Sequence, residues 1–220
     1  MITRVLNTEV EENTYICETG VPGRALVIDP GLSEDLVLAE LGDRDLTAGW
    51  VLLTHGHFDH IGSAATLQRE HGAEVWLHGA DRKLAEKANF LLMACRMPQR
   101  IETPVFDGLA EDGTTVAIGD EVATFWHAPG HSPGSCCIAW RDTLFSGDTI
   151  YRGHVGRDKF PGENRAVLAK TLRRLWDRID DDTVIRPGHG ASATWGEIRV
   201  SNTALRELAG IDDLEQEEAA

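Results

Sequence analysis

The chain has 220 residues, of which 42% are hydrophobic, and this is enough apolar content for a packed core rather than a disordered chain. A formal net charge of −15 argues against a nucleic-acid partner, because phosphate binding depends on clustered lysine and arginine. No apolar stretch approaches the roughly 20 residues that cross a bilayer, and the N-terminus lacks the pattern of a secretory signal. We therefore expect a cytoplasmic protein with neither a nucleic-acid nor a membrane partner.

The four cysteines do not form a recognisable disulfide or zinc-thiolate pattern. They are Cys17, Cys95, Cys136 and Cys137, with no Cys-x-x-Cys pair among them. The adjacent pair should point to opposite faces of a strand. We expect most of the four to be small buried hydrophobic residues in a reducing compartment.

Short strands and helices are predicted in alternation along the first half. The expected strands cover residues 2–7, 14–18, 24–29, 49–53 and 73–77. A helix is expected to begin at Ser33 as N-cap and to end at Gly42, and a second to cover residues 63–70. A third helix is expected over residues 80–95, where the apolar run 90–93 either packs on the core or lines a pocket.

The second half repeats this pattern. The expected strands cover residues 115–118, 121–128, 135–140, 143–145 and 183–185. An amphipathic helix is predicted over residues 165–178, and a closing helix over 198–208. The pattern predicts one domain over residues 1–220, with two similar halves at about 1–110 and 111–210. The halves should pack sheet against sheet with helices outside, followed by a solvated acidic tail at 211–220.

The most informative segment is Thr-His-Gly-His-Phe-Asp-His at residues 54–60. It follows the apolar run 49–53, so it should lie on the loop that leaves a buried strand. Three imidazoles and a carboxylate within six residues suit Zn²⁺, Mn²⁺ or Fe, and a tight turn can direct several of them at one point. The segment predicts a catalytic metal site.

Further candidate ligands follow in the second half, each at a predicted strand end. His131 lies in a Gly/Pro-rich loop, Asp148 follows an apolar strand in Ser-Gly-Asp-Thr, and His189 lies in Pro-Gly-His-Gly. Each motif alone is common. Their order after the histidine-rich segment is typical of a dinuclear metal site.

With these motifs, and with Ile28-Asp29-Pro30-Gly31 near the start, the chain resembles the metallo-β-lactamase-fold hydrolase superfamily, and within it the glyoxalase II-like branch. The resemblance covers nearly the whole chain. It implies an α/β fold in the form of a four-layer αβ/βα sandwich, with two mostly antiparallel sheets packed face to face and helices outside.

The resemblance also implies a ligand set and roles for individual residues. The first metal would be held by His55, His57 and His131, the second by Asp59, His60 and His189, and Asp148 would bridge the two. Asp29 would brace the ligand loop from a second shell. His55, His57, Asp59 and His60 are accordingly also the candidate catalytic residues. We expect two divalent ions per chain, with zinc favoured and iron or manganese as alternatives.

Residue types set some relatives aside. His57 stands where flavodiiron proteins carry glutamate, and Asp148 stands where the true β-lactamases carry cysteine or serine. Nucleases of the superfamily carry additional RNA-binding elements, for which this chain has neither the length nor the charge.

The activity implied is hydrolysis of a hydroxyacyl thioester such as S-lactoylglutathione by a hydroxide that bridges the metals. Asp59 could also hold the proton of that hydroxide. One alternative is an iron-dependent persulfide dioxygenase, which uses only His55, His131 and Asp148 on one metal. Others are a lactonase or another ester hydrolase of this fold, and a non-enzymatic binding domain.

Substrate contacts are less well marked. Tyr151, Arg157 and Lys159 follow Asp148 closely, and Arg157 is the nearest match to a basic residue that helps hold the glutathione carboxylate in glyoxalase II. Only 31 residues follow His189, so we expect a short relative that lacks the C-terminal glutathione-binding segment. The partner would be a small-molecule thioester, and the oligomeric state stays open. Of the other histidines, His154 is a candidate for substrate contact, while His71, His78 and His127 are expected to be structural.

Overall fold

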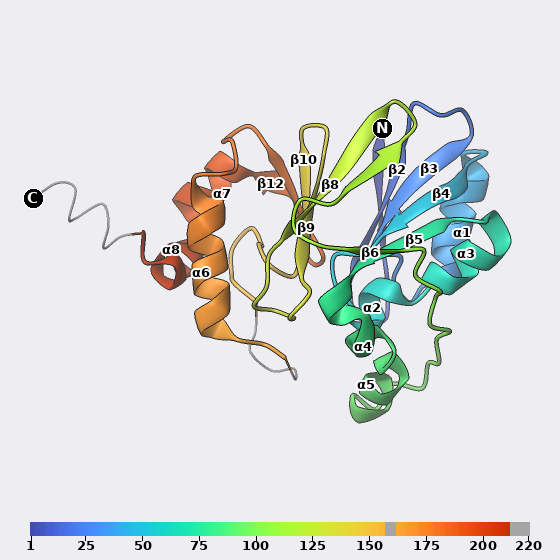
Figure 1. The fold of residues 1–220 in the computed structure, drawn as a ribbon, viewed down its shortest axis with the longest axis horizontal. Coiled ribbons are helices and arrows are strands. Elements are labelled where there is room, and N and C mark those ends of the chain that lie inside the picture. The colour runs from blue at the N-terminus through green and yellow to red at the C-terminus, as the bar shows by residue number, and fades with distance from the viewer. Residues whose placement is uncertain (157–161, 212–220) are drawn as a thin grey trace, which may run out of the picture.

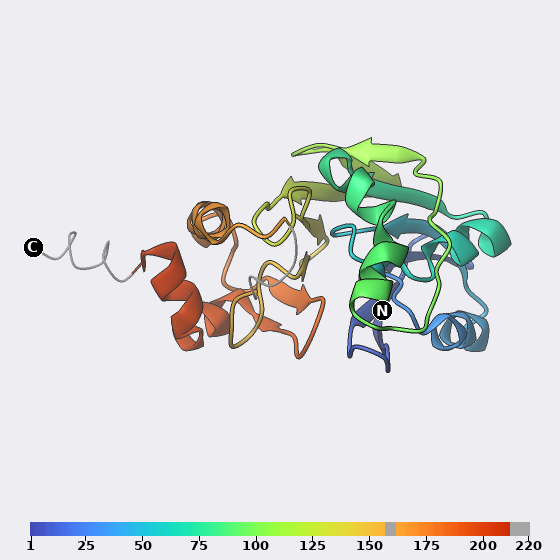
Figure 2. The same cartoon turned by 90° about the horizontal axis from the view of Figure 1, so that it is seen from below.

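Two six-stranded sheets pack against each other in the computed structural model, which describes residues 1–156 and 162–211. Helices cover the outer face of each sheet, so the chain folds as a four-layer αβ/βα sandwich (Figure 1). The view in Figure 2 shows the same separation, with α6, α7 and α8 on one side and α1 and α3 on the other. The predicted fold class is confirmed.

The first sheet has the order β1-β2-β3-β4-β5-β6. Its strands are β1 (Ile2–Leu6), β2 (Asn13–Glu18), β3 (Arg24–Ile28), β4 (Thr47–Leu52), β5 (Glu74–His78) and β6 (Gly108–Ala110). β1 to β3 form an antiparallel meander, whereas β3 to β6 pair in parallel. This sheet is therefore mixed rather than mostly antiparallel, because helices cross over between its parallel strands.

The second sheet has the order β12-β11-β10-β9-β8-β7. Its strands are β7 (Thr115–Ile118), β8 (Glu121–His127), β9 (Cys136–Trp140), β10 (Thr143–Gly147), β11 (Val184–Pro187) and β12 (Ala193–Thr194). Only β10 and β11 pair in parallel, joined through the α6 crossover, so this sheet is mostly antiparallel as expected.

The helices are α1 (Glu34–Asp43), α2 (Phe58–Ile61), α3 (Ala64–His71), α4 (Arg82–Ala85), α5 (Ala88–Ala94), α6 (Arg165–Trp176), α7 (Trp195–Ser201) and α8 (Thr203–Ala209). None of the helices within the described residues is long and apolar enough to cross a membrane.

Two predicted helices are interrupted. The helix expected over 80–95 is a short 3₁₀ turn, η1 (Gly79–Asp81), followed by the separate helices α4 and α5. The closing helix is broken at Asn202, whose backbone leaves the helical region at ψ 83° and whose side chain accepts the Leu205 N–H to begin α8. Ser33 precedes α1 but does not cap it, because its hydroxyl donates to Glu9 instead.

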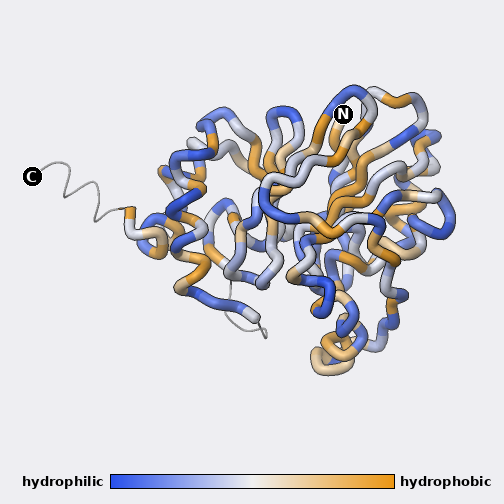
Figure 3. Tube along the Cα trace, viewed as in Figure 1, coloured by the Kyte–Doolittle hydropathy of each residue, from blue (hydrophilic) through white to orange (hydrophobic). Residues whose placement is uncertain are grey.

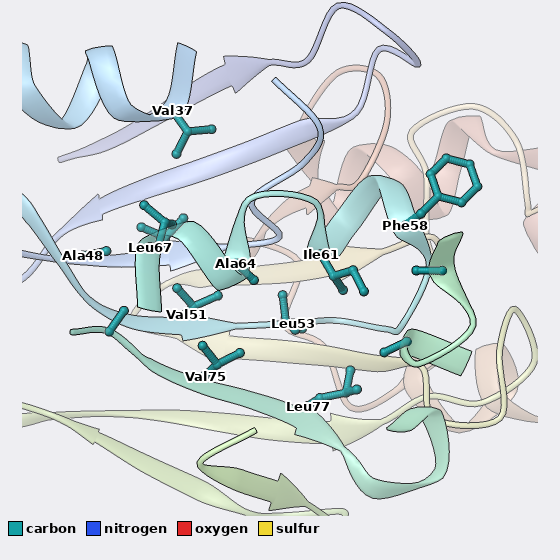
Figure 4. Close-up of a cluster of buried hydrophobic side chains, with 14 of the residues drawn as sticks. Val37, Ala48, Val51, Leu53, Phe58, Ile61, Ala64, Leu67, Val75 and Leu77 are labelled. Atoms are coloured by element: carbon teal, nitrogen blue, oxygen red, sulfur yellow. The ribbon is translucent and has the colours of Figure 1, made fainter. Parts of the chain in front are cut away.

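Three apolar clusters hold the layers together. The cluster between the sheets contains Tyr15 and Phe145, whose ring centroids lie 5.3 Å apart. A second cluster lies between the first sheet and α1 to α3, where Val51 and Leu53 meet Ile61 and Leu67 (Figure 4). The third packs α6 to α8 on the other sheet. The strands are thus anchored on both faces, and the loops at their ends are held in fixed positions.

Candidate metal centre

The predicted ligands lie at the ends of strands from both sheets. The residues from His55 to His60 lie on the loop after β4 and in α2, at the end of the first sheet where the parallel strands finish. His131 lies between β8 and β9, Asp148 directly follows β10, and His189 follows β11. The seven side chains come together in three overlapping groups of potential ligand atoms. His55 and His189, which are 134 residues apart in the chain, meet there because the two sheets pack against each other.

Three imidazoles form the first group of candidate ligands. Nδ1 of His57 lies 3.0 Å from Nε2 of His55 and 3.0 Å from Nε2 of His131. The rings stand nearly perpendicular to one another, so that their nitrogens rather than their faces meet. All three side chains are buried.

Asp59, His60 and His189 form the second group. Oδ2 of Asp59 lies 3.5 Å from Nε2 of His189 and 3.9 Å from Nε2 of His60. His189 is the most accessible of the three, so this side of the centre faces the open part of the pocket.

Asp148 lies between the two groups. Its Oδ2 is 3.5 Å from Nε2 of His131 and 3.7 Å from Nε2 of His189, while its Oδ1 is 3.5 Å from Nε2 of His60. One carboxylate thus approaches ligands of both groups, which is the position required of a bridging ligand.

The donors fit a pair of metal ions. Nitrogen and oxygen ligands about 2.1 Å from a tetrahedral ion lie about 3.4 Å from each other, close to the separations above. Within residues 1–156 and 162–211, Nε2 of His60 and Oδ1 of Asp148 are buried without a hydrogen-bond partner. Buried polar atoms are rarely left in this state unless an ion or ligand completes them. The chain therefore carries a His/Asp metal-binding cluster.

Burial and neighbouring charges shift the ionisation of these groups in opposite directions. Burial and then His131 lower the pKa of His57 to about 4, so its imidazole is neutral and able to ligate. For His60, burial acts to lower the pKa, but Asp148, Asp59 and Asp29 together raise it well above its usual value. Burial acts to raise the pKa of Asp148, but His60 and His131 lower it overall. The carboxylates are ionised, as ligands must be.

Asp29 braces the first ligand loop. Its Oδ1 accepts the Thr54 N–H at 2.7 Å, and its Oδ2 accepts the Thr54 hydroxyl at 2.6 Å and lies 2.9 Å from Nδ1 of His60. Asp29 also has a positive φ of 48°, an unusual backbone conformation that aspartate tolerates. The carboxylate thereby orients the His60 ring through its Nδ1 and leaves Nε2 available as a ligand atom.

Asp81 connects the two ligand loops and was not singled out from the sequence. Its Oδ2 accepts the Gly56 N–H at 2.9 Å and the Ser132 hydroxyl at 2.5 Å, and its Oδ1 accepts the Gly134 N–H at 2.6 Å. Gly56 lies between His55 and His57, whereas Ser132 follows His131. A signal was available, because Asp81 follows β5, the parallel neighbour of the strand that carries the first ligands.

Two further contacts orient the remaining histidines. Oε1 of Glu163 lies 3.2 Å from Nδ1 of His131, and both groups are buried. Nδ1 of His189 donates to the Glu11 carbonyl at 3.2 Å. The His189 loop is also fastened by Asn13, whose side chain donates to the carbonyls of Pro187 and Gly190 at 2.9 Å. Glu163 lacks a strand-end motif, so the sequence carried no signal for it.

The predicted substrate contacts are only partly described. Tyr151 lines a cleft of about 420 Å³ beside the metal centre, together with Arg152, His154 and His189. The Tyr151 ring stacks on His154 with centroids 4.2 Å apart. Burial raises the pKa of Tyr151 well above its usual value, and the charge of Asp148, which accepts a hydrogen bond from the Tyr151 hydroxyl, also raises it, so the phenol is neutral. Arg157 and Lys159 lie outside the described residues.

The other histidines lie away from the candidate ligands. His71, the last residue of α3, accepts the Ala48 N–H through Nδ1 at 3.0 Å. His78 stacks on His127 with centroids 4.2 Å apart, and Nε2 of His127 lies 2.9 Å from the Pro133 carbonyl. His127 therefore supports the His131 loop from outside the pocket.

Comparison with known protein families supports the assignment of these seven residues to a metal-binding cluster. The family model described as "Metallo-beta-lactamase superfamily" matches residues 7–189, which include all seven candidate ligands. Hydroxyacylglutathione hydrolase GloC of Haemophilus influenzae is 31% identical over 190 residues, covering 82% of this chain and 87% of that protein. A hydroxyacylglutathione hydrolase of Anaeromyxobacter dehalogenans is 32% identical, but only 62% of its length is matched, against 82% of this chain.

Solved structures show the same fold. The structure of TTHA1623 in a di-iron-bound form has a TM-score of 0.82 and 33% identity, covering 91% of this chain and 98% of that one. The ETHE1 structure from Myxococcus xanthus has a TM-score of 0.77 and 24% identity, covering 94% of this chain and 85% of that one, so the likeness concerns the fold alone.

Proposed function

Since this chain belongs to the metallo-beta-lactamase superfamily, we propose that it is a dinuclear metal-dependent thioesterase of the glyoxalase II type. Its substrate would be a hydroxyacyl thioester such as S-lactoylglutathione. The observation that carries the proposal is the position of Asp148, which approaches both groups of candidate ligands within 3.7 Å. The similarity to relatives named hydroxyacylglutathione hydrolase supports the choice of thioester.

Each group of side chains would hold one ion. His55, His57 and His131 would hold the first, and Asp59, His60 and His189 the second. When bound, two such ions supply a hydroxide nucleophile at neutral pH and stabilise the negative charge that develops on the substrate carbonyl. Zinc suits these donors, and iron suits them equally, as the di-iron form of one relative illustrates.

The chain's own groups orient the nucleophile and the substrate. Burial acts to raise the pKa of Asp59, but His60 and His189 lower it overall, so its carboxylate is ionised and would accept a hydrogen bond from the attacking water. Tyr151 donates to Asp148 and forms a wall of the adjoining cleft, where it would position the thiol part of the substrate. Because the metals would supply the hydroxide, this reaction does not need a serine nucleophile with its own base.

The proposal is tested by metal analysis combined with an activity assay. Purified protein should contain near two metal equivalents per chain and should hydrolyse S-lactoylglutathione, and chelator treatment should abolish the activity. His60→Ala should lower the metal content toward one equivalent, because it removes a ligand of the second ion. One tightly bound iron together with no thioesterase activity would refute the proposal.

A persulfide dioxygenase is the alternative that shares most of these ligands. It needs one iron held by His55, His131 and Asp148, so it leaves the group of Asp59, His60 and His189 without a use. The close approach of these three side chains favours the dinuclear reading. Oxygen consumption with glutathione persulfide, lost in zinc-loaded protein, would decide for the dioxygenase.

A further inference from the structure

A second cleft lies on the other side of the His131 loop, beneath helices α4 and α5. It has a volume of about 400 Å³, within the range of small-molecule binding sites. We refer to it as the α4–α5 cleft, and its walls include Lys83, Leu84, Lys87, Phe90, Leu91 and Pro133. None of the proposed metal ligands lines it, so it is separate from the cleft at Tyr151.

The α4–α5 cleft is close to the metal centre. Pro133 follows His131 by two residues, so their Cα atoms lie within about 7 Å. Gly162, which also lines the cleft, directly precedes Glu163, whose carboxylate contacts His131. The N-terminal end of α4 is joined to the same loop through Asp81. The α4–α5 cleft therefore adjoins the loop that carries His131.

The cleft presents apolar side chains to solvent. Phe90 in α5 is 62% exposed although it is aromatic, and the neighbouring Met93 is 55% exposed. The end of the molecule formed by α5 in Figure 1 is correspondingly hydrophobic in Figure 3. Large apolar side chains that gather beside a cleft, rather than scattering over a surface, mark a binding site.

The cleft also carries positive charge on an acidic protein. Lys83 and Lys87 line it, and within the described parts of the chain neither ammonium group forms an ion pair. Their neighbour Arg82, which lies outside this cleft, is instead paired with Glu86 at 3.2 Å. On a chain whose overall net charge is −15, two lysines that form no ion pair among the described residues and that stand at an apolar wall favour an anion with an apolar body.

We propose that the α4–α5 cleft binds the acyl group of the substrate, and that this group is an aliphatic chain ending in a carboxylate. Phe90, Leu84 and Leu91 would contact the chain, and Lys83 and Lys87 the terminal carboxylate. This inference rests on the proposed hydrolase function, since it places the scissile bond at the metals. The inference adds thioesters of carboxylated aliphatic acids as a substrate class, which differs from lactoyl thioesters.

The experiment compares two acids that differ only in the terminal carboxylate. Adipate and hexanoate are titrated into the metal-loaded protein by calorimetry, as analogues of the acid product. Adipate should bind about fivefold more tightly than hexanoate, because exposed charge pairs contribute modestly. In the double variant Lys83→Ala/Lys87→Ala this ratio should fall to near one. Arg82→Gln, which removes a positive charge outside the cleft, should keep it.

Phe90→Ala provides the second arm. This substitution should weaken the binding of hexanoate and of adipate equally, by about tenfold. The reason is that the aromatic ring becomes buried when the aliphatic chain binds, and its removal deletes that apolar contact. Equal binding of the two acids to the wild type, or the same loss of ratio in Arg82→Gln, would overturn the proposal. A dimer in sedimentation that dissociates on Phe90→Ala, with no preference for adipate, would assign the apolar face to a second copy instead.

The two proposals can fail separately. If the protein binds adipate selectively but hydrolyses no thioester, the proposed activity is wrong, and the cleft is shown to bind a carboxylated aliphatic chain that is not the acyl group of a thioester. If it hydrolyses S-lactoylglutathione but binds both acids equally, the activity stands and the assignment of the cleft is wrong. A panel of thioesters with neutral and carboxylated acyl chains then tests the same preference kinetically, as the ratio of their kcat/KM values.

Discussion

At the scale of single residues, the metal centre depends on groups that never touch a metal. Asp29, Asp81 and Glu163 each fix the orientation of a candidate ligand or its loop. Of these, Asp81 makes three hydrogen bonds that span the two halves of the molecule, so it holds the His55–His57 segment at a constant distance from His131. Such supporting groups commonly affect metal affinity nearly as strongly as the ligands do.

Asp81→Asn should therefore weaken metal binding by about tenfold while the protein stays folded. The amide offers one acceptor oxygen, so its NH₂ must face one of the donors that the carboxylate now satisfies. Chelator competition measures the affinity. Asp107→Asn is the matched control, since Asp107 also accepts a backbone N–H, from Val75, but lies away from the metal centre. Unchanged affinity in Asp81→Asn would contradict the role given to this carboxylate.

Gly188 is a residue whose lack of a side chain is required by the site. A Cβ there would lie 2.4 Å from Oδ1 of Asp148 and 2.5 Å from Cε1 of His60. Gly188→Ala must therefore displace the Asp148 carboxylate or the His60 ring. We expect kcat/KM for the thioester to fall about 100-fold, with less than two metal equivalents retained. Gly20→Ala, in the turn between β2 and β3, where an added Cβ meets nothing within 4 Å, should behave as the wild type.

At the scale of elements, strand ends position the ligands and short helices support them. α6 illustrates this, because its N-cap Asn164 accepts the Val167 N–H through its side chain and donates its own N–H to the Gly130 carbonyl at 2.7 Å. Glu163, which contacts His131, immediately precedes this cap. The start of α6 is therefore coupled to the loop that carries a candidate ligand.

Loss of the Asn164 cap should be measurable as a lower stability of the fold. Asn164→Ala should lower the free energy of unfolding by about 1 kcal/mol, because the Val167 N–H in the first turn of α6 loses its side-chain acceptor. The corresponding fall in Tm is about 2–4 °C for a chain of this size. Asn164→Asp keeps the acceptor and should restore most of the loss. A full loss in Asn164→Asp would show that the cap is not the cause.

At the scale of the whole molecule, two sheets enclose most of the reactive side chains that do not belong to the centre. Cys17, Cys136 and Cys137 are buried between or behind the sheets, whereas Cys95 is exposed after α5. Burial raises the pKa of Cys17 to about 12, and burial likewise raises that of Cys137 to about 12. At pH 8 these two thiols are almost entirely protonated and therefore unreactive.

A thiol-labelling experiment tests this packing. In the native protein at pH 8 we expect one thiol per chain, Cys95, to react rapidly with a chromogenic disulfide. All four should react after denaturation. Cys95→Ser should remove the fast phase and leave the slow one unchanged. Rapid labelling of two or more thiols in the native protein would contradict the burial of the strands that carry them.

The sequence predicted much of this architecture because local patterns determine local structure. The alternation of apolar and polar residues predicted most strands within two residues of their observed ends. It missed β6 and β12, which contain three and two residues and carry no periodic signal. The continuous helix expected over 80–95 was also wrong, since the pattern does not reveal a break without glycine or proline.

By itself, the sequence determined which side chains can bind metal, because imidazole and carboxylate chemistry is a property of each residue and the motifs place them at strand ends. Only the tertiary structure decided how they combine. The packing of the two sheets places Asp148 between the histidines of both groups, and it brings Asp81 and Glu163 to loops distant in the chain. Such contacts depend on the positions of separate elements in space, and no local pattern of residues encodes them.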